Sequence, residues 1–289
     1  MNDAPFSRLL RLPQVASTNT VLRESVVADP AAWPHLSALI ADHQTAGRGR
    51  TGRQWHTPAG TALTASIVLR PLVATERLGW LTLLTGLAAI RALRALAPDE
   101  ASRLGLKWPN DVLVDGADTA VDGWGRQRKV AGILAEVVPG TVSTPATPDA
   151  ARAPRASRAA VVVGLGVNLR QREADLPVPW ATSLERAGIG APGHAPSPLE
   201  LLRAVGHELE EILTTWEGAG GDVAGSGLRD AVRDVCVTLG DRVQVAQPGG
   251  GLLSGTAEDI DDEGRLVVVT AGGARVPVVA GDVSQLRNP

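Results

Sequence analysis

The most apolar stretch of this 289-residue chain runs from Leu78 to Ile90, between Arg77 and Arg91. It is too short to span a bilayer, and it therefore predicts a buried core helix, which we place at residues 78–96. Only 3% of the residues are aromatic, with no Tyr, one Phe and seven Trp. The core must consequently be built from Leu, Val and Ala, and several tryptophans are expected to serve as flat surfaces.

The overall composition excludes several classes of protein. The net charge is −3 and 20% of the residues are charged, which argues against wholesale nucleic-acid binding. The single cysteine, Cys236, excludes an internal disulfide and a cysteine-rich metal site, and it fits a reducing compartment. Residues 1–17 contain no continuous apolar segment of the kind found in signal peptides. We therefore expect a cytoplasmic protein that does not associate with membranes.

Residues 1–228 mix helical and strand-like segments. Besides the core helix, we expect helices after Ser17-Thr-Asn-Thr20, with capping side chains, and after the capping box Ser197-Pro-Leu-Glu200. Short apolar and β-branched runs predict strands at 36–41, 61–69, 104–108, 112–114, 129–138 and 160–167. This mixture predicts an α+β domain with a mixed or antiparallel sheet backed by helices.

Two segments interrupt that pattern, and the end of the chain has a different texture. Residues 139–158 are rich in Ala, Pro, Thr and Arg without periodicity, which predicts a disordered excursion between two strands; 115–128 is a shorter excursion. Beyond residue 229, four strand-like runs are separated by glycine-containing turns. They predict a second small domain, residues 229–289, with a barrel or sandwich fold.

The strongest chemical signal is the segment Gln44-Thr-Ala-Gly-Arg-Gly-Arg-Thr-Gly-Arg-Gln-Trp55, here called the glycine–arginine loop. Glycine permits close backbone approach, and arginine offers paired donors to phosphate or carboxylate. The loop therefore predicts an anion clamp for a nucleotide phosphate, with Trp55 placed to stack on a purine. The alternatives are an RNA-binding segment, although such segments are usually longer and repeated, and a core position for Trp55.

Lysine is rare, since only two of the 28 Lys and Arg residues are lysine. Lys107 opens the segment Lys-Trp-Pro-Asn-Asp111, a polar cluster at a strand end, for which a simple turn is the alternative. Lys129 enters an apolar strand, where it would need an anion if buried; an edge-strand lysine in solvent is the alternative. A further segment, Gly164-Leu-Gly-Val-Asn168, is no Rossmann site because no helix follows, and its Asn168 could read an adenine edge.

In this order, these segments resemble one family, the biotin protein ligases, in the short bacterial form without an N-terminal DNA-binding domain. The match covers 17–19, 44–55, 107–111, 129–132 and 164–168. The resemblance implies a class II synthetase-like catalytic domain and an SH3-like C-terminal barrel. It also implies a biotin–[acetyl-CoA-carboxylase] ligase that forms biotinyl-5′-AMP from biotin and ATP. Biotin would then pass to a lysine of its partner, the biotin carboxyl carrier domain of acyl-CoA carboxylases.

The resemblance also assigns roles to individual residues. The biotin-binding set would be Ser17, Thr18, Asn19, Gln44, Arg48, Gly49, Arg50, Lys129 and Gly132. The nucleotide-binding set would be Arg48, Arg50, Arg53, Trp55, Asn110, Lys129 and Asn168. Lys129, Arg50 and Asp111 are the predicted catalytic residues, and Asp111 would also help to place Mg²⁺.

These residue types suit that chemistry. Biotin's carboxylate attacks the α-phosphorus of ATP, so two anions must approach, and cations with a divalent metal offset their repulsion. The carrier amine must be deprotonated to attack, and Asp111 could orient it or remove its proton. Because the mixed anhydride is reactive, a closing loop must exclude water. Three glycines leave residues 47–53 loose, so we expect disorder there before ligand arrives.

Only 16 residues precede Ser17, so we expect a monofunctional ligase that binds no operator DNA, as a monomer or weak homodimer. A lipoate- or octanoate-transferring ligase of the same fold and a non-catalytic biotin sensor are the alternatives. Gln44 and the glycine–arginine loop favour biotin over lipoate, because both belong to the pattern of the biotin family that the chain resembles. The intact set of Lys129, Arg48 and Asp111 argues against a sensor.

Overall fold

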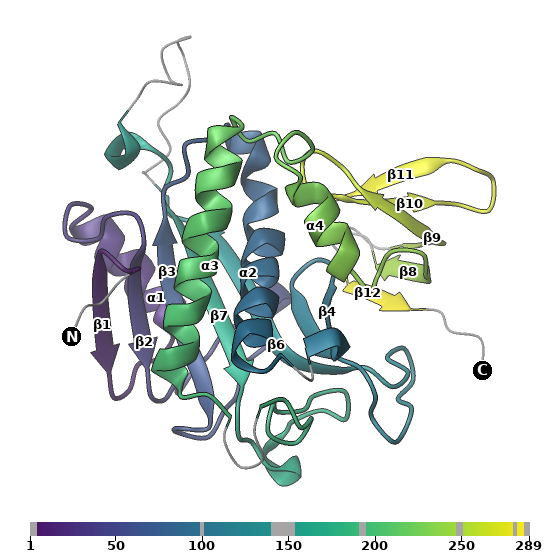
Figure 1. Cartoon of the computed structure of the whole chain (residues 1–289), viewed down its shortest axis with the longest axis horizontal. Coiled ribbons are helices and arrows are strands. Elements are labelled where there is room, and N and C mark those ends of the chain that lie inside the picture. The colour runs from purple at the N-terminus through teal and green to yellow at the C-terminus, as the bar shows by residue number, and fades with distance from the viewer. Residues whose placement is uncertain are drawn as a thin grey trace.

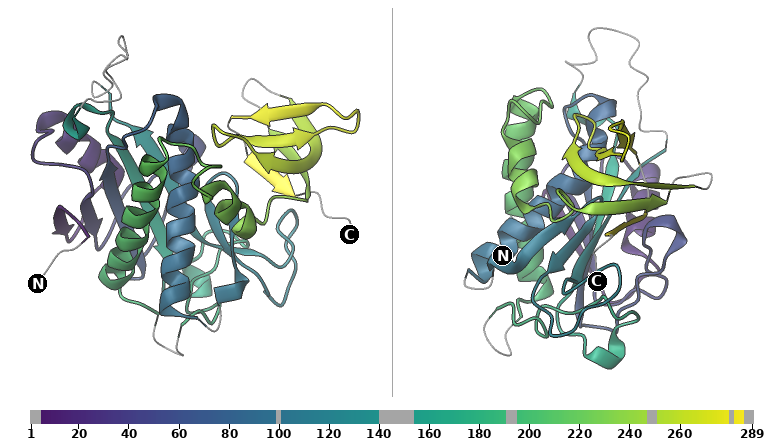
Figure 2. Two further views of the ribbon diagram at one scale, coloured as in Figure 1. Left: turned by 45° about the horizontal axis from the view of Figure 1, so that its top comes forward. Right: turned by 90° about the vertical axis from the view of Figure 1, so that its right-hand side faces the viewer.

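The chain folds into two units that follow one another along the sequence. The computed structural model describes residues 5–98, 101–139, 154–190, 195–246, 251–279 and 282–285. A seven-stranded sheet with helices on both faces forms the first unit, and a five-stranded sheet forms the second (Figure 1). The smaller sheet stands beside one edge of the larger unit (Figure 2).

The larger sheet has the strand order β1-β2-β3-β7-β6-β5-β4. Its strands are β1 (Arg8–Leu12), β2 (Ser37–Ala41), β3 (Ala62–Leu69), β4 (Leu104–Lys107), β5 (Asp111–Val114), β6 (Arg128–Val137) and β7 (Val161–Asn168). Only the β1–β2 pair is parallel, so the predicted mixed sheet is confirmed. Strand β1 was not predicted, because its Arg-Leu-Leu-Arg-Leu run is short and partly polar.

The helices are α1 (Thr18–Ala28), α2 (Trp80–Leu96), α3 (Pro198–Gly218) and α4 (Leu228–Val235). Helices α2 and α3 lie side by side on one face of the larger sheet, and α1 covers the other (Figure 1). Alternate residues of β2 show the two layers, because Ala38 and Ile40 join the large core cluster whereas Leu39 packs with Leu22 of α1. The apolar segment 75–96 is long enough to cross a membrane, but most of it is buried in the protein. It is therefore the predicted core helix.

The starts of α1 and α3 differ in how they are capped. Ser197 and Glu200 form the predicted capping box of α3, with their reciprocal bonds at 3.2 and 3.3 Å. Ser17 is the N-cap residue of α1, but its hydroxyl makes no hydrogen bond to the helix, so the predicted side-chain cap there is wrong. The first backbone N–H of α1, that of Thr18, instead donates to the side chain of Gln44 at 2.8 Å. The start of α1 is thus hydrogen-bonded to the neighbouring loop that contains Gln44.

The smaller sheet is antiparallel and open. Its strands are β8 (Arg242–Ala246), β9 (Leu252–Ile260), β10 (Leu266–Val269), β11 (Arg275–Val278) and β12 (Asp282–Gln285), in the order β11-β10-β9-β8-β12. Its first four strands match the four predicted runs, and β12 was missed because Val283 is its single apolar residue. Among the described residues β11 and β12 do not pair, so no closed barrel forms.

Two tryptophan side chains form hydrogen bonds between the larger and the smaller unit. Trp80 Nε1 donates to the carbonyl of Asp262 and Trp108 Nε1 to that of Gly264, both at 3.0 Å and both in the β9–β10 turn. The backbone N–H of Trp108 also donates to Thr238 Oγ1 at 2.9 Å. Helix α4 packs against α2 and β4. These contacts hold the smaller sheet beside the turn between β4 and β5.

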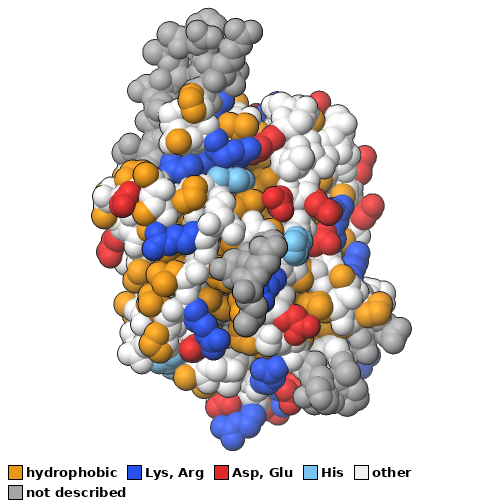
Figure 3. Space-filling model, turned by 60° about the vertical axis from the view of Figure 1, so that its left-hand side comes forward, with side chains coloured by type: hydrophobic (Ala, Val, Ile, Leu, Met, Phe, Trp, Pro, Cys, Tyr) orange, Lys and Arg blue, Asp and Glu red, His pale blue; other side chains and the backbone are white. Residues whose placement is uncertain are grey.

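The predicted excursion at 139–158 falls largely on residues 140–153, outside the described part of the chain. Its end has defined structure, because Arg155–Ser157 form a short 3-10 turn. Arg155 donates two hydrogen bonds, of 2.7 and 2.5 Å, to the carboxylate of Glu217 on α3. The shorter excursion, residues 115–128, also has defined contacts, since the buried side chain of Arg128 donates hydrogen bonds to the carbonyls of Thr119 and Gly125. On the face seen in Figure 3, basic and acidic side chains are interspersed, and no broad basic patch gathers there.

Candidate active site

A cavity of about 520 Å³ opens on the α1 face of the larger sheet. It is lined by the start of α1, the glycine–arginine loop, the β4–β5 turn, strands β6 and β7, and two residues of β12. All predicted site residues line it: Ser17, Thr18, Asn19, Gln44, Arg48, Gly49, Arg50, Arg53, Trp55, Asn110, Asp111, Lys129, Gly132 and Asn168. These predicted residues, which span 151 positions from Ser17 to Asn168, therefore meet in one place.

Three glycines form much of the floor of the cavity, beside the side chain of Leu134. Gly132 on β6, and Gly164 and Gly166 on β7, present bare backbone on this face of the sheet. A Cβ atom on Gly164 would lie 2.3 Å from Asn19 Oδ1, and one on Gly166 would lie 2.6 Å from the ring of Trp55. Those distances are too short for any side chain. Glycine at 164 and 166 therefore leaves room for the side chains of Asn19 and Trp55, which line the cavity.

One end of the cavity, here called the polar end, is a fixed set of neutral hydrogen-bonding groups. Gln44 Oε1 accepts from both the N–H and the hydroxyl of Thr18, at 2.8 and 3.1 Å. Ser66 Oγ bonds to Thr18 Oγ1 at 2.8 Å and to Asn19 Oδ1 at 2.5 Å. Ser17 lies beside them, only 3% exposed, with its hydroxyl not used by α1. Such an array suits a neutral polar ligand group that both donates and accepts.

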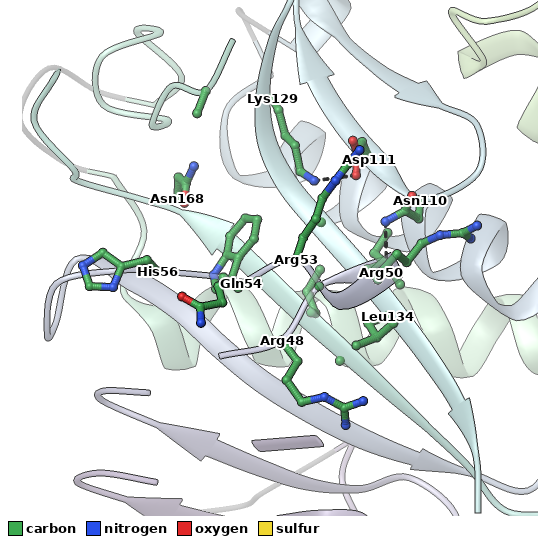
Figure 4. A pocket seen from close by; sticks show the side chains of 18 of the residues that line it. Arg48, Arg50, Arg53, Gln54, His56, Asn110, Asp111, Lys129, Leu134 and Asn168 are labelled. Atoms are coloured by element: carbon green, nitrogen blue, oxygen red, sulfur yellow. Dashed lines mark hydrogen bonds and ion pairs between the residues drawn. The ribbon is translucent and has the colours of Figure 1, made fainter. Parts of the chain in front are cut away.

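The middle of the cavity, here called the charged centre, contains an ion pair. Lys129 Nζ lies 2.6 Å from Asp111 Oδ1, and the two side chains are only 22% and 17% exposed (Figure 4). The ammonium is also 5.5 Å from the centre of the Trp55 ring. Lys129 thus points into the cavity and meets an anion, and the solvent-exposed alternative is wrong. Because the surroundings are partly desolvated, charges here interact more strongly than in water.

The three arginines of the glycine–arginine loop diverge. Arg53 extends toward Asp111, whereas Arg48 points away from Lys129 (Figure 4). Arg48 instead forms an ion pair with Glu136 at 3.1 Å. Both arginines line the cavity, and the contact of Arg48 with carboxylate and phosphate stays a prediction.

The glycine–arginine loop has its own backbone hydrogen bonds. The N–H of Gly49 donates to the carbonyl of Arg53 at 2.7 Å, and that of Trp55 to the carbonyl of Gly47 at 2.9 Å. Gly52 takes a φ of 75°, which favours glycine at this tight turn. Disorder of this loop before ligand binds stays a prediction. We expect its amides to exchange fast in the free protein.

Asn168 has protein partners at both ends of its amide. Its Nδ2 donates to the carbonyl of Thr182 at 3.0 Å, and its Oδ1 accepts from Gln171 at 2.9 Å. One N–H and one lone pair of the amide are not used by these two bonds, so the amide retains the capacity to pair with an adenine edge. In the β4–β5 turn, Asn110 Nδ2 similarly donates to the carbonyl of Ile133 at 3.0 Å. Both asparagines therefore shape the cavity wall, and their contact with nucleotide stays a prediction.

An aromatic wall that was not predicted from the sequence completes the cavity. The rings of Trp124 and Trp180 stack with centroids 5.7 Å apart and planes 8° apart. Lys107 is only 6% exposed, and its ammonium lies 3.6 Å from the centre of the Trp124 ring. The single sequence signal was the abundance of Trp, because Trp124 sits in a segment without periodicity. Ser284 of β12, also missed, brings the C-terminal unit to the cavity.

The acidic groups set a limit on metal binding. Within the described ranges, no group of three or more His, Cys, Asp or Glu side chains is placed to hold a metal ion. Asp111 is the one predicted carboxylate ligand lining the cavity. Mg²⁺ commonly takes one or two carboxylates together with substrate phosphates, so Asp111 fits an ion that arrives with a nucleotide.

Relatives of this chain carry the same architecture. Residues 12–146 match the biotin/lipoate A/B protein ligase family, and residues 238–285 match the biotin protein ligase C-terminal domain. The biotin–[acetyl-CoA-carboxylase] ligase of Mycobacterium tuberculosis is 38% identical over 86% of this chain and 79% of its own length. The enzyme of that name from Paracoccus denitrificans is 32% identical over 91% and 95% of the two chains.

Two further comparisons concern the extent and shape of the chain. It spans 64% of the bifunctional ligase/repressor of Bacillus subtilis, with 29% identity. A solved structure of the biotin protein ligase from Aquifex aeolicus in complex with biotin and ATP is 26% identical, with a TM-score of 0.70. That match covers 98% of this chain and 100% of the other. On the strength of the sequence matches along most of its length, this chain belongs to the biotin protein ligase family.

Proposed function

We propose that this chain is an ATP-dependent biotin protein ligase that acts on a biotin carboxyl carrier domain. The observation that carries the proposal is the division of one cavity into a neutral polar end and a charged centre. Biotin has the same division, with an uncharged ureido ring at one end and a carboxylate at the other. The ring would bond to Ser17, Thr18 and Gln44, which leaves the carboxylate facing Lys129.

The first step joins two anions. An oxygen of the biotin carboxylate attacks the α-phosphorus of ATP, the bond to the β-phosphate oxygen breaks, and pyrophosphate leaves. Lys129 and Arg53 would stabilise the charge that builds on the α-phosphoryl oxygens, with Arg50 nearby in the loop. Magnesium, when bound with ATP, neutralises phosphate charge. Preorganised cations in a partly dry site are effective because they need no rearrangement when charge develops.

The second step transfers the acyl group. The neutral ε-amine of the carrier lysine attacks the acyl carbon of biotinyl-5′-AMP, an amide forms, and AMP leaves. Asp111, whose Oδ1 lies 2.6 Å from Lys129 Nζ, would orient the incoming amine or accept its proton. A carrier lysine that enters beside Asp111 would compete with Lys129 for the same carboxylate. This exchange couples arrival of the amine to release of the Lys129 ammonium.

The rival functions fit the site less well. A lipoate or octanoate ligase needs an apolar channel where this cavity has Thr18 and Gln44 hydrogen-bonded side by side. A sensor without catalysis needs no ion pair of lysine and carboxylate at the charged centre. Biotin-dependent pyrophosphate release from ATP separates a ligase from a sensor, and replacing biotin by lipoate separates the two ligases.

The deciding experiment uses a purified biotin carboxyl carrier domain as acceptor. The full chain is incubated with the domain, biotin, ATP and Mg²⁺, and the products are analysed by streptavidin blot and by mass. We expect one added biotin on one carrier lysine, and none when ATP is omitted or when that lysine is replaced by arginine. An unlabelled carrier in the complete reaction refutes the proposal.

Three finer features accompany the proposal. The catalytic domain would comprise residues 1–228 and the C-terminal domain residues 229–289, although α4 packs on α2 and β4 of the larger unit. The chain would act as a monomer or weak homodimer, which sedimentation measures. It would bind no operator DNA, which a gel-shift assay with biotin and ATP present tests.

A further inference from the structure

The carboxylate of Glu136, near the end of β6, contacts side chains from two other segments, α1 and the glycine–arginine loop. Its side chain is 17% exposed. Asn19 Nδ2 lies 3.0 Å from Oε2, and Arg23 Nη1 lies 2.9 Å from Oε1, both from α1. Arg48 of the glycine–arginine loop reaches the same carboxylate at 3.1 and 3.3 Å. No sequence motif singled out Glu136, and it makes no contribution to the chemistry described above.

The Arg48 contact attaches the glycine–arginine loop to the sheet. The backbone bonds inside the loop, from Gly49 to Arg53 and from Trp55 to Gly47, close the turn upon itself. Thr45 and Ala46 at the start of the loop donate to the carbonyls of Val15 and Ala16, whereas the two bonds inside the turn do not fix it to the rest of the protein. The Arg48–Glu136 ion pair joins the loop to β6 across 88 positions of sequence. The Arg48 side chain is 44% exposed, so the contact acts mainly by placing the guanidinium against both carboxylate oxygens.

We infer that Glu136 is a positioning residue that holds the glycine–arginine loop over the cavity and thereby sets how long biotinyl-5′-AMP is retained. The inference rests on the proposed function. The mixed anhydride reacts with water and with any free amine that reaches it, so its retention depends on the loop. Arg48 carries the effect from the Glu136 carboxylate to the loop, whereas Arg23 and Asn19 join the same carboxylate to α1.

A purely structural role for Glu136 makes a different prediction. Through Arg23 and Asn19 the carboxylate also secures α1 to β6, and α1 forms the polar end of the cavity. If that were its whole role, removing Arg23 would have the same consequence as removing the charge of Glu136. The two roles are therefore separated by comparing Glu136→Gln with Arg23→Gln, because only the first change breaks the attachment of Arg48.

The experiment measures escape of the intermediate from the full chain. Each protein is loaded with radiolabelled biotin, ATP and Mg²⁺ without carrier, desalted, and followed for loss of bound biotinyl-5′-AMP. In parallel, serum albumin is added as a bystander and its biotinylation is measured. For Glu136→Gln we expect release about tenfold faster than in the wild type, a change of about 1.4 kcal/mol. Albumin labelling should rise in proportion, while the pyrophosphate burst at saturating biotin stays within threefold.

The controls make each outcome decisive. Arg23→Gln should release the intermediate within twofold of the wild-type rate, as should Asp42→Asn, which breaks an exposed ion pair with Arg11 away from the cavity. Equal release from Glu136→Gln and the wild type, or from Glu136→Gln and Arg23→Gln, overturns the inference. If Glu136→Gln does not fold, as judged by thermal melting, Arg48→Gln breaks the same contact and must show the same rapid release. A wild-type chain that never labels its carrier refutes the proposed function instead.

Discussion

Replacing Lys129 with arginine keeps the positive charge at the charged centre but changes its shape. The lysine ammonium is a compact charge, whereas guanidinium is a broad planar fork. The space is narrow, because a Cβ on Gly132 would lie only 3.1 Å from Lys129 Nζ and 3.2 Å from the ring of Trp55. A guanidinium fits there only if Trp55 moves. The donor would then miss the α-phosphoryl oxygens that it must contact.

The expected cost follows from losing one preorganised donor to the transition state. Such losses lower kcat by about 10²–10³, or roughly 3–4 kcal/mol. Stability should change much less, because arginine can still pair with Asp111 and both side chains are only partly buried. A change below about 1 kcal/mol corresponds to a shift in Tm of a few degrees for a chain of this size.

The assay is pyrophosphate release from ATP at saturating biotin, with single-turnover kinetics to isolate the chemical step. Lys107→Arg is the matched control, since its ammonium lies on the face of Trp124 and guanidinium also stacks on aromatic rings. We expect Lys107→Arg to lose less than about tenfold, a small fraction of the loss expected for Lys129→Arg. A Lys129→Arg protein that keeps more than a tenth of the wild-type rate would show that a compact ammonium is not required.

Three other changes test separate parts of the structure. Gly166→Ala places a Cβ 2.6 Å from the ring of Trp55, so kcat/KM for ATP should fall at least about tenfold. Gly218→Ala is the control, because its Cβ meets no atom within 4 Å, and it should leave kcat/KM unchanged. Trp108→Phe removes one indole bond to the C-terminal unit, which should cost about 1 kcal/mol and speed amide exchange in the β9–β10 turn. Burial lowers the pKa of His35 from 6.5 to about 4, so the unfolded chain binds more protons between those values. The free energy of unfolding should fall as pH drops from 6.5 to 4, and denaturant titrations should show a smaller fall for His35→Asn.

Sequence reasoning located the residues whose chemistry is visible at short spacing. The glycine–arginine loop and the Lys107–Asp111 segment each gather unusual residues within a few positions, and both line the cavity. The need of a buried lysine for an anion also predicted a partner for Lys129, although only the fold identifies Asp111 as that partner.

What the sequence did not reveal depends on contacts between distant segments. Glu136 looks like an ordinary strand residue until folding brings Arg48 to it from 88 positions away. Trp124 and Trp180 stack only because two irregular segments meet beside β6. The predicted barrel was an overstatement for a related reason, since four strand-like runs do not specify whether the edges of a sheet close.

The scarcity of lysine has a consequence for an enzyme whose intermediate acylates amines. Both lysines line the cavity, where Lys107 is 6% exposed beneath Trp124 and Lys129 is paired with Asp111. The other 26 of the 28 basic residues are arginines, whose guanidinium stays protonated and is a poor nucleophile. The ligase therefore offers its own escaped product almost no side chain to modify. Self-biotinylation should be rare, and stray labelling should fall on the lysines of surrounding proteins.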